Sequence, residues 1–296
     1  MSSDTRKTET DNGRRSFLKV AGIAGLGAMM TPLQAAGQSS ANPGGQFSGQ
    51  DLQVWSCGGL AESLIPACKA YEQRTGAKVA YTGAFAAALG KSLMASATTD
   101  VFAGRVLDLA KNLRKADKMV YFKPLCFTEY VLVVPKGNPA NIQSVQDLGR
   151  PGVKVVLAPE ASTPGGPASL VLLKKAGVKE AALNNAIVKG SCVQMVMPDL
   201  ISGKGDVSVM ERRLVHLPMF AGKVDTLDIP AQFQPPPPLT FTIGVMKSAQ
   251  NRKMADDYVE FICSAEGQSY FTKQGFISAY SAQGLEMTER LGVKDV

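Results

Sequence analysis

Histidine and closely paired cysteines are scarce in this 296-residue sequence. His216 is its one histidine, and none of its five cysteines forms a Cys-x-x-Cys pair. A structural zinc site needs four ligands, which are mostly Cys and His at paired spacings, so a single histidine and the lack of a Cys-x-x-Cys pair leave little for a conventional one. A hydrolase needs a nucleophile beside a general base, and the sequence also lacks a Gly-x-Ser-x-Gly elbow. The sequence therefore predicts neither an enzyme nor a cofactor, and His216 is expected to be a surface or packing residue.

Runs of Lys and Arg interleaved with aromatic residues are also missing. The formal charge is +7, of which residues 1–36 contribute +2, leaving +5 for the remaining chain. Nucleic-acid binding requires a basic stripe or patch, so nucleic acid is not expected as a partner. A mildly basic body either favours encounter with anions or serves only solubility, and composition leaves both interpretations open.

No apolar run reaches the roughly 20 residues that a membrane-spanning helix needs. The stretch Val20 to Met30 is short and rich in Ala and Gly, and small residues follow it at Ala35 and Ala36. It is preceded by a segment that resembles the twin-arginine export motif, whose matching residues are Arg14, Arg15, Phe17 and Leu18. We therefore expect residues 1–36 to be a signal peptide for export to the periplasm by the twin-arginine route, with no stable membrane insertion. A short membrane anchor is the alternative.

Short strands and helices alternate through the first part of the mature chain, after a Gly/Ser-rich linker at residues 37–50. Apolar segments typical of strands occur at 52–55, 78–81 and 100–103. Patterns with helical periodicity separate them at 60–71 and 86–97. This alternation predicts one doubly wound α/β lobe.

The same alternation begins again after residue 128. Four prolines at 235–238 precede an apolar strand that we expect to return to the first lobe. The predicted strands are 130–134, 153–157, 186–188, 206–210 and 239–245, and the predicted helices end near 176 or span 193–201 and 252–274. The sequence thus predicts an α/β fold with two doubly wound, Rossmann-like lobes joined by crossover strands. Lobe 1 would comprise 51–128 plus 240–285, and lobe 2 would comprise 129–239.

Several short motifs occur in an order that resembles one family. They combine small-residue loops after strands, an apolar strand that runs into Pro-Lys-Gly-Asn-Pro, and an aromatic C-terminal helix. The motifs are Ser56-Cys57-Gly58-Gly59-Leu60, Thr99-Asp100-Val101-Phe102-Ala103, 129–139, Asp147-Leu148, Ala158-Pro159-Glu160, Pro164-Gly165-Gly166-Pro167-Ala168, Glu260-Phe261-Ile262 and Gly267-Gln268-Ser269-Tyr270-Phe271. Over residues 51–278 they resemble the type II periplasmic solute-binding proteins, nearest the molybdate/tungstate-binding proteins of bacterial ABC transporters.

This resemblance implies a receptor that is not an enzyme. Its two lobes would clamp a small inorganic oxyanion of the molybdate or tungstate type, held by hydroxyl and backbone N–H groups at the carboxyl ends of strands. Closure of the cleft would signal occupancy to the membrane subunits of an ABC transporter. We expect the receptor to be a monomer. A sensor kinase is the alternative partner.

Five loops carry the ligand-binding positions that the resemblance implies. They follow the predicted strands of both lobes. The residues are Ser56, Cys57, Gly58 and Gly59 in the first loop, Phe85 and Ala86 in the second, Thr163 and Gly165 in the third, Ser191, Cys192 and Val193 in the fourth, and Glu211 in the fifth.

Three of these positions depart from the family. It usually has a serine where Gly59 stands, and serines in the loop at 84–87, which here has no hydroxyl. It favours a tyrosine about where Glu211 stands. An ionised Glu211 would repel a dianion unless Arg212 or Arg213 offsets its charge.

The cysteines support an alternative ligand. Cys57 and Cys192 fall in ligand loops of different lobes, each before a helix N-terminus, where the thiol pKa is expected to be lowered. With Cys126 they would form a site for a thiophilic species such as arsenite or Cu(I). The other interpretation treats the cysteines as small buried hydrophobic residues, which is the expectation for Cys68 and Cys263.

Overall fold

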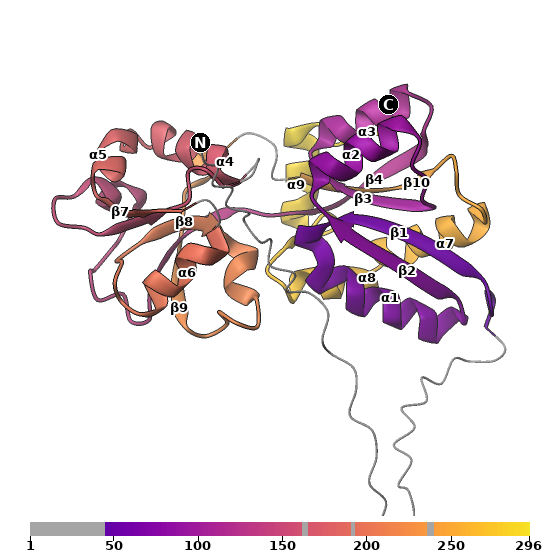
Figure 1. Cartoon of the computed structure of the whole chain (residues 1–296), viewed down its shortest axis with the longest axis horizontal. Coiled ribbons are helices and arrows are strands. Elements are labelled where there is room, and N and C mark those ends of the chain that lie inside the picture. Colours follow the sequence, from indigo (N-terminus) through magenta and orange to yellow (C-terminus); the bar gives the residue numbers. More distant parts are fainter. Residues whose placement is uncertain (1–44, 162–164, 191–192, 236–239) are drawn as a thin grey trace, which may run out of the picture. The chain divides into compact units, whose positions relative to one another are not determined.

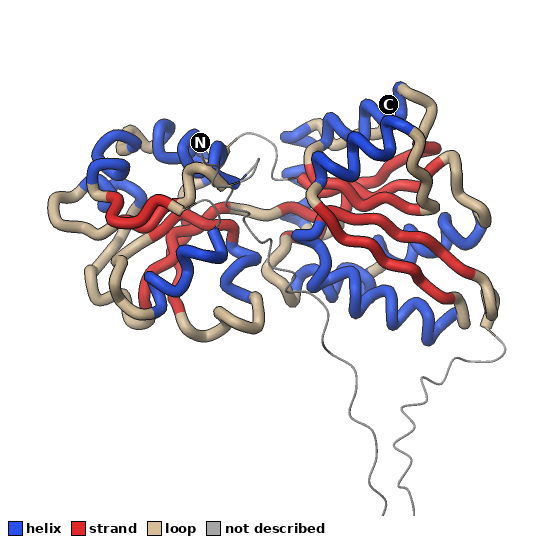
Figure 2. Tube along the Cα trace, in the orientation of Figure 1, coloured by secondary structure: helices blue, strands red, loops and turns tan. Residues whose placement is uncertain are grey.

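The computed structural model describes residues 45–161, 165–190, 193–235 and 240–296. The predicted export signal and most of the proline run lie outside these residues. The described elements form two α/β lobes, in which each group of strands carries its own helices (Figures 1 and 2).

A six-stranded sheet forms the centre of lobe 1, with its strands in the order β11-β4-β10-β3-β1-β2. The bounds are β1 Asp51–Cys57, β2 Lys78–Ala84, β3 Val101–Arg105, β4 Met119–Phe127, β10 Thr240–Met246 and β11 Ile277–Ser278. Strand β1 pairs in parallel with β2 and β3, whereas β10 is antiparallel to β3 and β4. The carboxyl ends of β1, β2 and β3 therefore lie at the same end of the sheet, where open α/β sheets bind ligands.

Helices cover both faces of this sheet (Figure 1). Helices α1, α7 and α8 pack on one face through buried residues such as Leu64, Tyr258 and Phe271. Helices α2, α3 and α9 pack on the other through residues such as Leu93 and Leu113. Their bounds are α1 Ala61–Thr75, α2 Ala86–Ala95, α3 Leu107–Lys115, α7 Arg252–Cys263, α8 Ala265–Thr272 and α9 Ala282–Leu291, with a 3-10 turn η1 at Gly58–Leu60.

Lobe 2 is built on a smaller mixed sheet. Strand β5 is antiparallel to both β8 and β9, β6 pairs in parallel with β7, and a bridge between Val155 and Val207 joins the two groups. The strands are β5 Tyr130–Pro135, β6 Val155–Leu157, β7 Ala186–Lys189, β8 Ser208–Glu211 and β9 Val224–Asp228. The helices are α4 Gly165–Lys175, α5 Lys179–Asn184 and α6 Val193–Ile201, with 3-10 turns η2 Val145–Gly149, η3 Arg212–His216 and η4 Ala231–Phe233. Residues of α4 and α5 belong to one apolar cluster and residues of α6 to another.

The chain passes from lobe 1 to lobe 2 through Thr128 and Glu129, which connect β4 to β5. It returns as β10, whose seven residues are all buried between β3 and β4. The two lobes joined by crossing segments agree with the fold class predicted from the sequence, which is confirmed. The lobe limits at 128/129 and 239/240 remain a prediction.

Two segments differ in detail from the sequence predictions. The helical region predicted at 252–274 is divided at Ser264, whose backbone is extended and whose Oγ accepts a hydrogen bond from the N–H of Gly267, so a second helix begins there. The described end of the predicted linker packs on lobe 1. Phe47 is buried in the core, and its N–H donates to the carbonyl of Thr75 at 3.0 Å.

The sheet-facing side of α1 should carry much of the stability of lobe 1. Leu64 on α1 is fully buried, whereas Leu285 on α9 is 56% exposed. We predict that Leu64→Ala lowers the free energy of unfolding by about 2–5 kcal/mol, because it leaves a cavity that its neighbours fill only in part. The matched change Leu285→Ala should stay within about 0.5 kcal/mol. Urea unfolding of the mature chain measures both, and equal losses would contradict this description of the core.

Candidate functional site

Glu211, the last residue of β8, joins two arginines that come from different lobes. Its Oε1 lies 2.8 Å from Nη1 of Arg105, the last residue of β3, and its Oε2 lies 2.9 Å from Nε of Arg213 in η3. The side chains of Glu211 and Arg105 are each 6% exposed and that of Arg213 is 14% exposed. We call these three residues the Glu211 cluster.

The two guanidinium groups decide the charge of this buried carboxylate. Burial by itself would raise the pKa of Glu211, but the attraction of Arg105 and Arg213 and the hydrogen bonds that they donate outweigh burial and lower the pKa to about 2. Two positive charges and one negative charge therefore coexist at neutral pH, and the cluster has a net positive charge. An ionised Glu211 offset by Arg213 agrees with the sequence expectation. Arg212 instead pairs with Glu129 and Asp228.

Arg105 is held from several sides. Its guanidinium lies over the ring of Phe241, 5.3 Å from the ring centroid. Tyr130, the first residue of β5, lies near Arg105, and burial raises the pKa of its hydroxyl, so the phenol is uncharged at neutral pH. These contacts keep Arg105 at the carboxyl end of β3, beside the loop that follows β1.

Arg213 lies over the glycine loop of lobe 1. A Cβ atom at Gly59 would be 3.2 Å from Cζ and Nη2 of Arg213, so the absent side chain makes room for the guanidinium. Within the described part of the chain, Arg213 hydrogen-bonds through Nε alone, to Glu211. Its two terminal amino groups therefore remain available as donors. The departure from serine at position 59 thus replaces a small hydroxyl with the head of an arginine.

Ser56 has its hydroxyl already engaged. The side chain is fully buried, with Oγ 2.6 Å from the hydroxyl of Tyr81 and 3.0 Å from the carbonyl oxygen of Cys57. A ligand would have to displace one of these partners to reach Ser56. Its predicted ligand-binding role remains a prediction, and Gly58 and Gly59 are the more accessible part of this loop.

The expected low pKa of the Cys57 thiol is wrong. Cys57 is buried, and burial raises its pKa even though the N–H of Gly59 donates to the sulfur and two arginines lie near. The loss of solvation outweighs these local effects. Cys192 lies outside the described residues, so the same expectation is not tested there.

The strand order separates two of the three cysteines of the alternative site. Cys57 ends β1 and the fully buried Cys126 lies on β4, with β3 and β10 between these strands. Three strand spacings of about 4.8 Å place their backbones roughly 14 Å apart, too far to bind one metal ion. Among the described residues, no group of three or more His, Cys, Asp or Glu could hold a metal ion. Cys68 is buried in the core, as predicted.

The second loop presents an aromatic side chain. Phe85 follows β2 directly, occupies the N-cap position of α2, and is 75% exposed. Position 58 touches this loop, because a Cβ atom at Gly58 would be 3.6 Å from the carbonyl oxygen of Ala84. Ala86 is half-buried in the first turn of α2. The first two predicted ligand loops therefore lie side by side, as the parallel pairing of β1 and β2 requires.

Fewer of the predicted ligand-binding residues of lobe 2 lie within the described residues. Thr163, Ser191 and Cys192 lie outside the described residues, whereas Gly165 and Val193 begin α4 and α6. Arg105 and Tyr130 are the main residues that the sequence analysis missed. A basic residue that ends a predicted strand, as Arg105 does, was the available signal.

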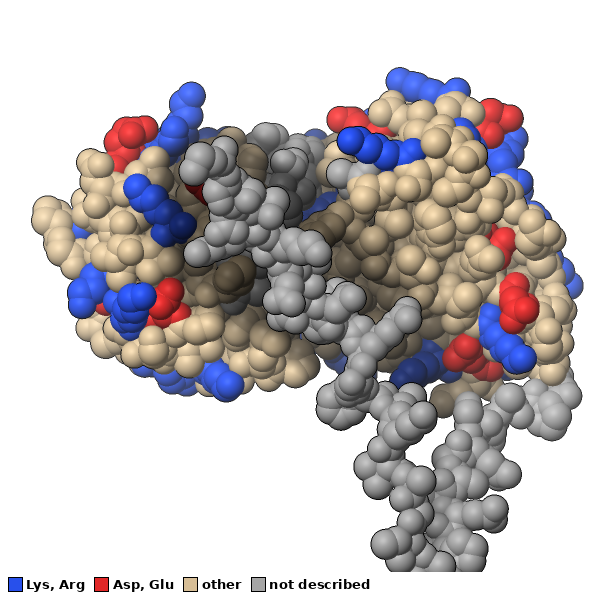
Figure 3. All heavy atoms as spheres, in the orientation of Figure 1, with Lys and Arg blue, Asp and Glu red and all other residues tan. Residues whose placement is uncertain are grey.

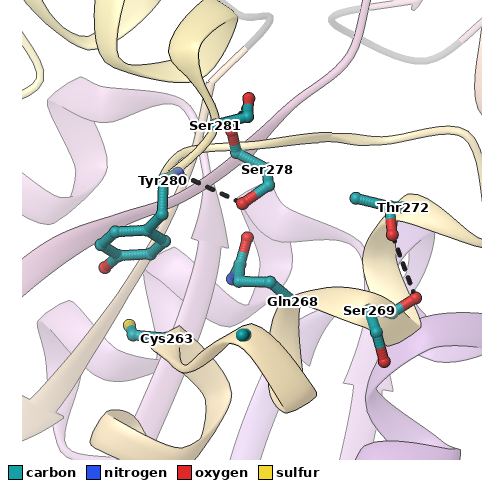
Figure 4. Close-up of a pocket in the computed structure, with 8 residues that line it drawn as sticks. Cys263, Gln268, Ser269, Thr272, Ser278, Tyr280 and Ser281 are labelled. Atoms are coloured by element: carbon teal, nitrogen blue, oxygen red, sulfur yellow. Dashed lines mark hydrogen bonds between the residues drawn. The ribbon is translucent and has the colours of Figure 1, made fainter.

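A pocket of about 370 Å³ is built from other elements than the candidate site. Figure 4 shows side chains from α7, α8, β11 and the segment after β11 around it. Its lining residues carry no charge and are Cys263, Ala265, Gln268, Ser269, Thr272, Ser278, Tyr280 and Ser281.

Figure 3 shows Lys and Arg dispersed over the visible face, without one large basic patch. None of the helices in the described ranges has the length and apolar character needed to cross a membrane.

Comparisons with known proteins agree with this architecture. A model of the family described as bacterial extracellular solute-binding protein matches residues 52–277. A sulfate-binding protein from Synechococcus elongatus is 24% identical and covers 89% of this chain and 83% of its own length. The molybdate-binding protein ModA from Mycobacterium bovis is 24% identical, over 84% of this chain and 94% of its own. A solved substrate-binding domain from Clostridium difficile superposes with a TM-score of 0.69 at 19% identity, over 77% of this chain and 98% of that one.

The Glu211 cluster should make stability depend on pH in a defined range. The pKa of Glu211 falls from about 4.3 in an unfolded chain to about 2 in the fold. Ionised Glu211 therefore stabilises the fold above about pH 4.3, and this stabilisation, of about 3 kcal/mol, is lost as the pH falls toward about 2. We predict that Glu211→Gln removes this part of the pH dependence. The variant should also be less stable at pH 7 by roughly 3–5 kcal/mol, because the charge of Arg105 stays buried.

Urea unfolding of the wild type, Glu211→Gln and Glu286→Gln between pH 7 and 2 measures this effect. Glu286 is exposed on α9, so its variant should follow the wild-type curve. A Glu211→Gln curve parallel to the wild type below pH 4 would show that Glu211 is not held ionised by its arginines.

Proposed function

Because the chain belongs to the bacterial extracellular solute-binding proteins, we propose that it is the periplasmic receptor of an ABC transporter and captures a small oxyanion. The family match confirms the resemblance inferred from the sequence motifs, and members of this family bind solutes rather than catalyse reactions. The relatives described above are named for molybdate and sulfate. Molybdate, tungstate and sulfate are therefore the first anions to test for binding.

One observation carries the oxyanion assignment, namely the position of Arg213. Its Nε is bound to Glu211 while its terminal amino groups lie over Gly59 without a hydrogen bond in the described chain. A guanidinium offers its donors in a planar fork that matches two oxygens of a carboxylate or other oxyanion. Because Glu211 fixes one edge of this fork, the other edge is oriented before the ligand arrives.

The balance of charge also supports an anion. Arg105 and Arg213 together outweigh Glu211, so the cluster attracts negative charge, and the body of the chain is itself basic. The thiol groups offer less to a ligand, because burial raises the pKa of both Cys57 and Cys126.

Binding would be coupled to closure of the two lobes. The proposed anion donors belong to both lobes, since Gly58 follows β1 and Arg213 follows β8. A ligand that contacts both lobes stabilises the closed form by its difference in affinity between the two forms. The membrane subunits would recognise that form.

We further propose that the twin-arginine signal at residues 1–36 directs the chain to the periplasm.

Replacing Arg213 should weaken oxyanion binding selectively. We predict that Arg213→Gln lowers the affinity for molybdate, tungstate or sulfate by about 10- to 100-fold, because hydrogen bonds from a charged donor are lost. The neighbouring Arg212→Gln is the matched control, since Arg212 pairs with Glu129 and Asp228. Titration calorimetry on the mature, reduced protein measures the affinities.

Arsenite and Cu(I) are titrated in parallel, with Cys57→Ser. Binding of a thiophilic species that Cys57→Ser abolishes, together with no oxyanion binding, would refute the oxyanion assignment and leave the receptor role in place.

The export proposal has its own test. We predict that Arg14→Lys with Arg15→Lys leaves the full-length precursor inside the cell, because the paired arginines are the recognised feature of this route. Cell fractionation and immunoblotting measure the distribution, with Lys19→Arg as the control. Unchanged periplasmic accumulation of the double variant would exclude the twin-arginine route.

A further inference from the structure

Phe85 is the most exposed of the large apolar side chains in the described part of the chain, at 75%. Single exposed apolar residues are common on protein surfaces, so exposure alone indicates nothing. Its position is less ordinary. It occupies the N-cap of α2, where Ser, Thr, Asp or Asn would accept a helix N–H, and it makes no side-chain cap. Neither core packing nor helix capping therefore accounts for an aromatic residue at position 85.

The Phe85 ring lies in the loop next to the candidate oxyanion site. The residue before it, Ala84, is paired with Cys57 at the ends of β2 and β1, and a Cβ atom at Gly58 would be 3.6 Å from the Ala84 carbonyl oxygen. The next residue, Gly59, touches the guanidinium of Arg213. Gly58 and Gly59 thus lie between the loop that carries Phe85 and the guanidinium of Arg213.

Lobe 2 repeats this character at its own predicted ligand loop. Met195, in the first turn of α6, is 72% exposed and follows closely on the loop at 191–193. Both lobes therefore present a large apolar side chain, Phe85 at a position where the family resemblance implies ligand contacts and Met195 two residues after such a position. A bare inorganic oxyanion has no apolar surface to contact such side chains, and burying its charge against them would be unfavourable.

We propose that the ligand is an organic oxyanion, whose charged head binds Arg213 and whose apolar substituent packs against Phe85. This inference rests on the proposed function, because it assumes that Arg213 receives the anion. It narrows the class of ligand from any small oxyanion to a carboxylate, sulfonate or phosphonate with an apolar body. Inorganic oxyanions would offer Arg213 the same oxygen atoms as this charged head, but they lack the apolar body that Phe85 would contact. The modest positive charge of the Glu211 cluster suits a head with a single negative charge.

Three sulfur oxyanions allow the contributions of the charged head and of the apolar body to the affinity to be measured separately. Sulfate is the inorganic anion, methanesulfonate has a sulfonate head with a small substituent, and benzenesulfonate adds a ring. We expect benzenesulfonate to bind the mature wild-type protein about tenfold more tightly than methanesulfonate, because its ring and Phe85 lose exposure to water. Phe85→Ala should remove this difference, because benzenesulfonate loses about tenfold in affinity while methanesulfonate, with its smaller apolar surface, loses much less. Titration calorimetry measures all six affinities.

Met94→Ala is the matched control, because Met94 lies near the other end of α2 and is 42% exposed. This variant should keep the full preference for benzenesulfonate. Circular dichroism checks that each variant is folded, which is expected because both side chains are exposed. Arg213→Gln should weaken the binding of methanesulfonate and benzenesulfonate alike.

The possible failures point to different errors. Equal affinity for the two sulfonates, or a preference that survives in Phe85→Ala, overturns the organic ligand while anion binding at Arg213 stands. If folded wild-type protein binds none of the three anions, nor molybdate or tungstate, the proposed function itself fails, and the inference fails with it.

Discussion

A buried carboxylate between two guanidinium groups is the interaction on which the candidate site depends. Glu211 is almost inaccessible to water, and a charge in that position persists only when it is paired and hydrogen-bonded. Arg105 and Arg213 meet this requirement from β3 and η3. The same contacts fix the direction of Arg213 and link the ends of two strands in different lobes. Removing Glu211 would leave two buried positive charges without a counter-charge, whereas removing either arginine would leave a single ion pair.

Two departures from the family resemblance are explained together by this interaction. The carboxylate at position 211 demands cations, and one of them, Arg213, reaches across to the loop after β1. A Cβ atom at position 59 would be 3.2 Å from that guanidinium, so any side chain there would require the arginine to shift by a few tenths of an ångström. The glycine and the glutamate are therefore parts of one arrangement, in which an arginine takes the place of hydroxyl donors.

Local patterns in the sequence predicted the strands and helices whose formation depends on the hydrophobicity of neighbouring residues. The apolar run of β5 and the return strand β10 were visible because both are buried along their whole length. Strand β4 was missed because Lys123 and Pro124 interrupt its pattern. In the site, the strand ends were predictable from the alternation of elements, but the pairing of Arg105 with Glu211 joins residues far apart in sequence. The pKa of Cys57 was predicted wrongly because a helix terminus can be read from sequence, whereas burial is a property of the fold.

A transport receptor must release its ligand as well as capture it, and the Glu211 cluster is suited to both. Two buried arginines without a carboxylate would hold an anion strongly and would themselves be costly to bury. Glu211 neutralises one of the two charges, which leaves an oriented but moderate attraction at Arg213. Affinity would then depend on what else the ligand contacts, including the apolar side chains of the neighbouring loops. Selectivity obtained in this way is lost when the lobes separate, because those contacts belong to both lobes.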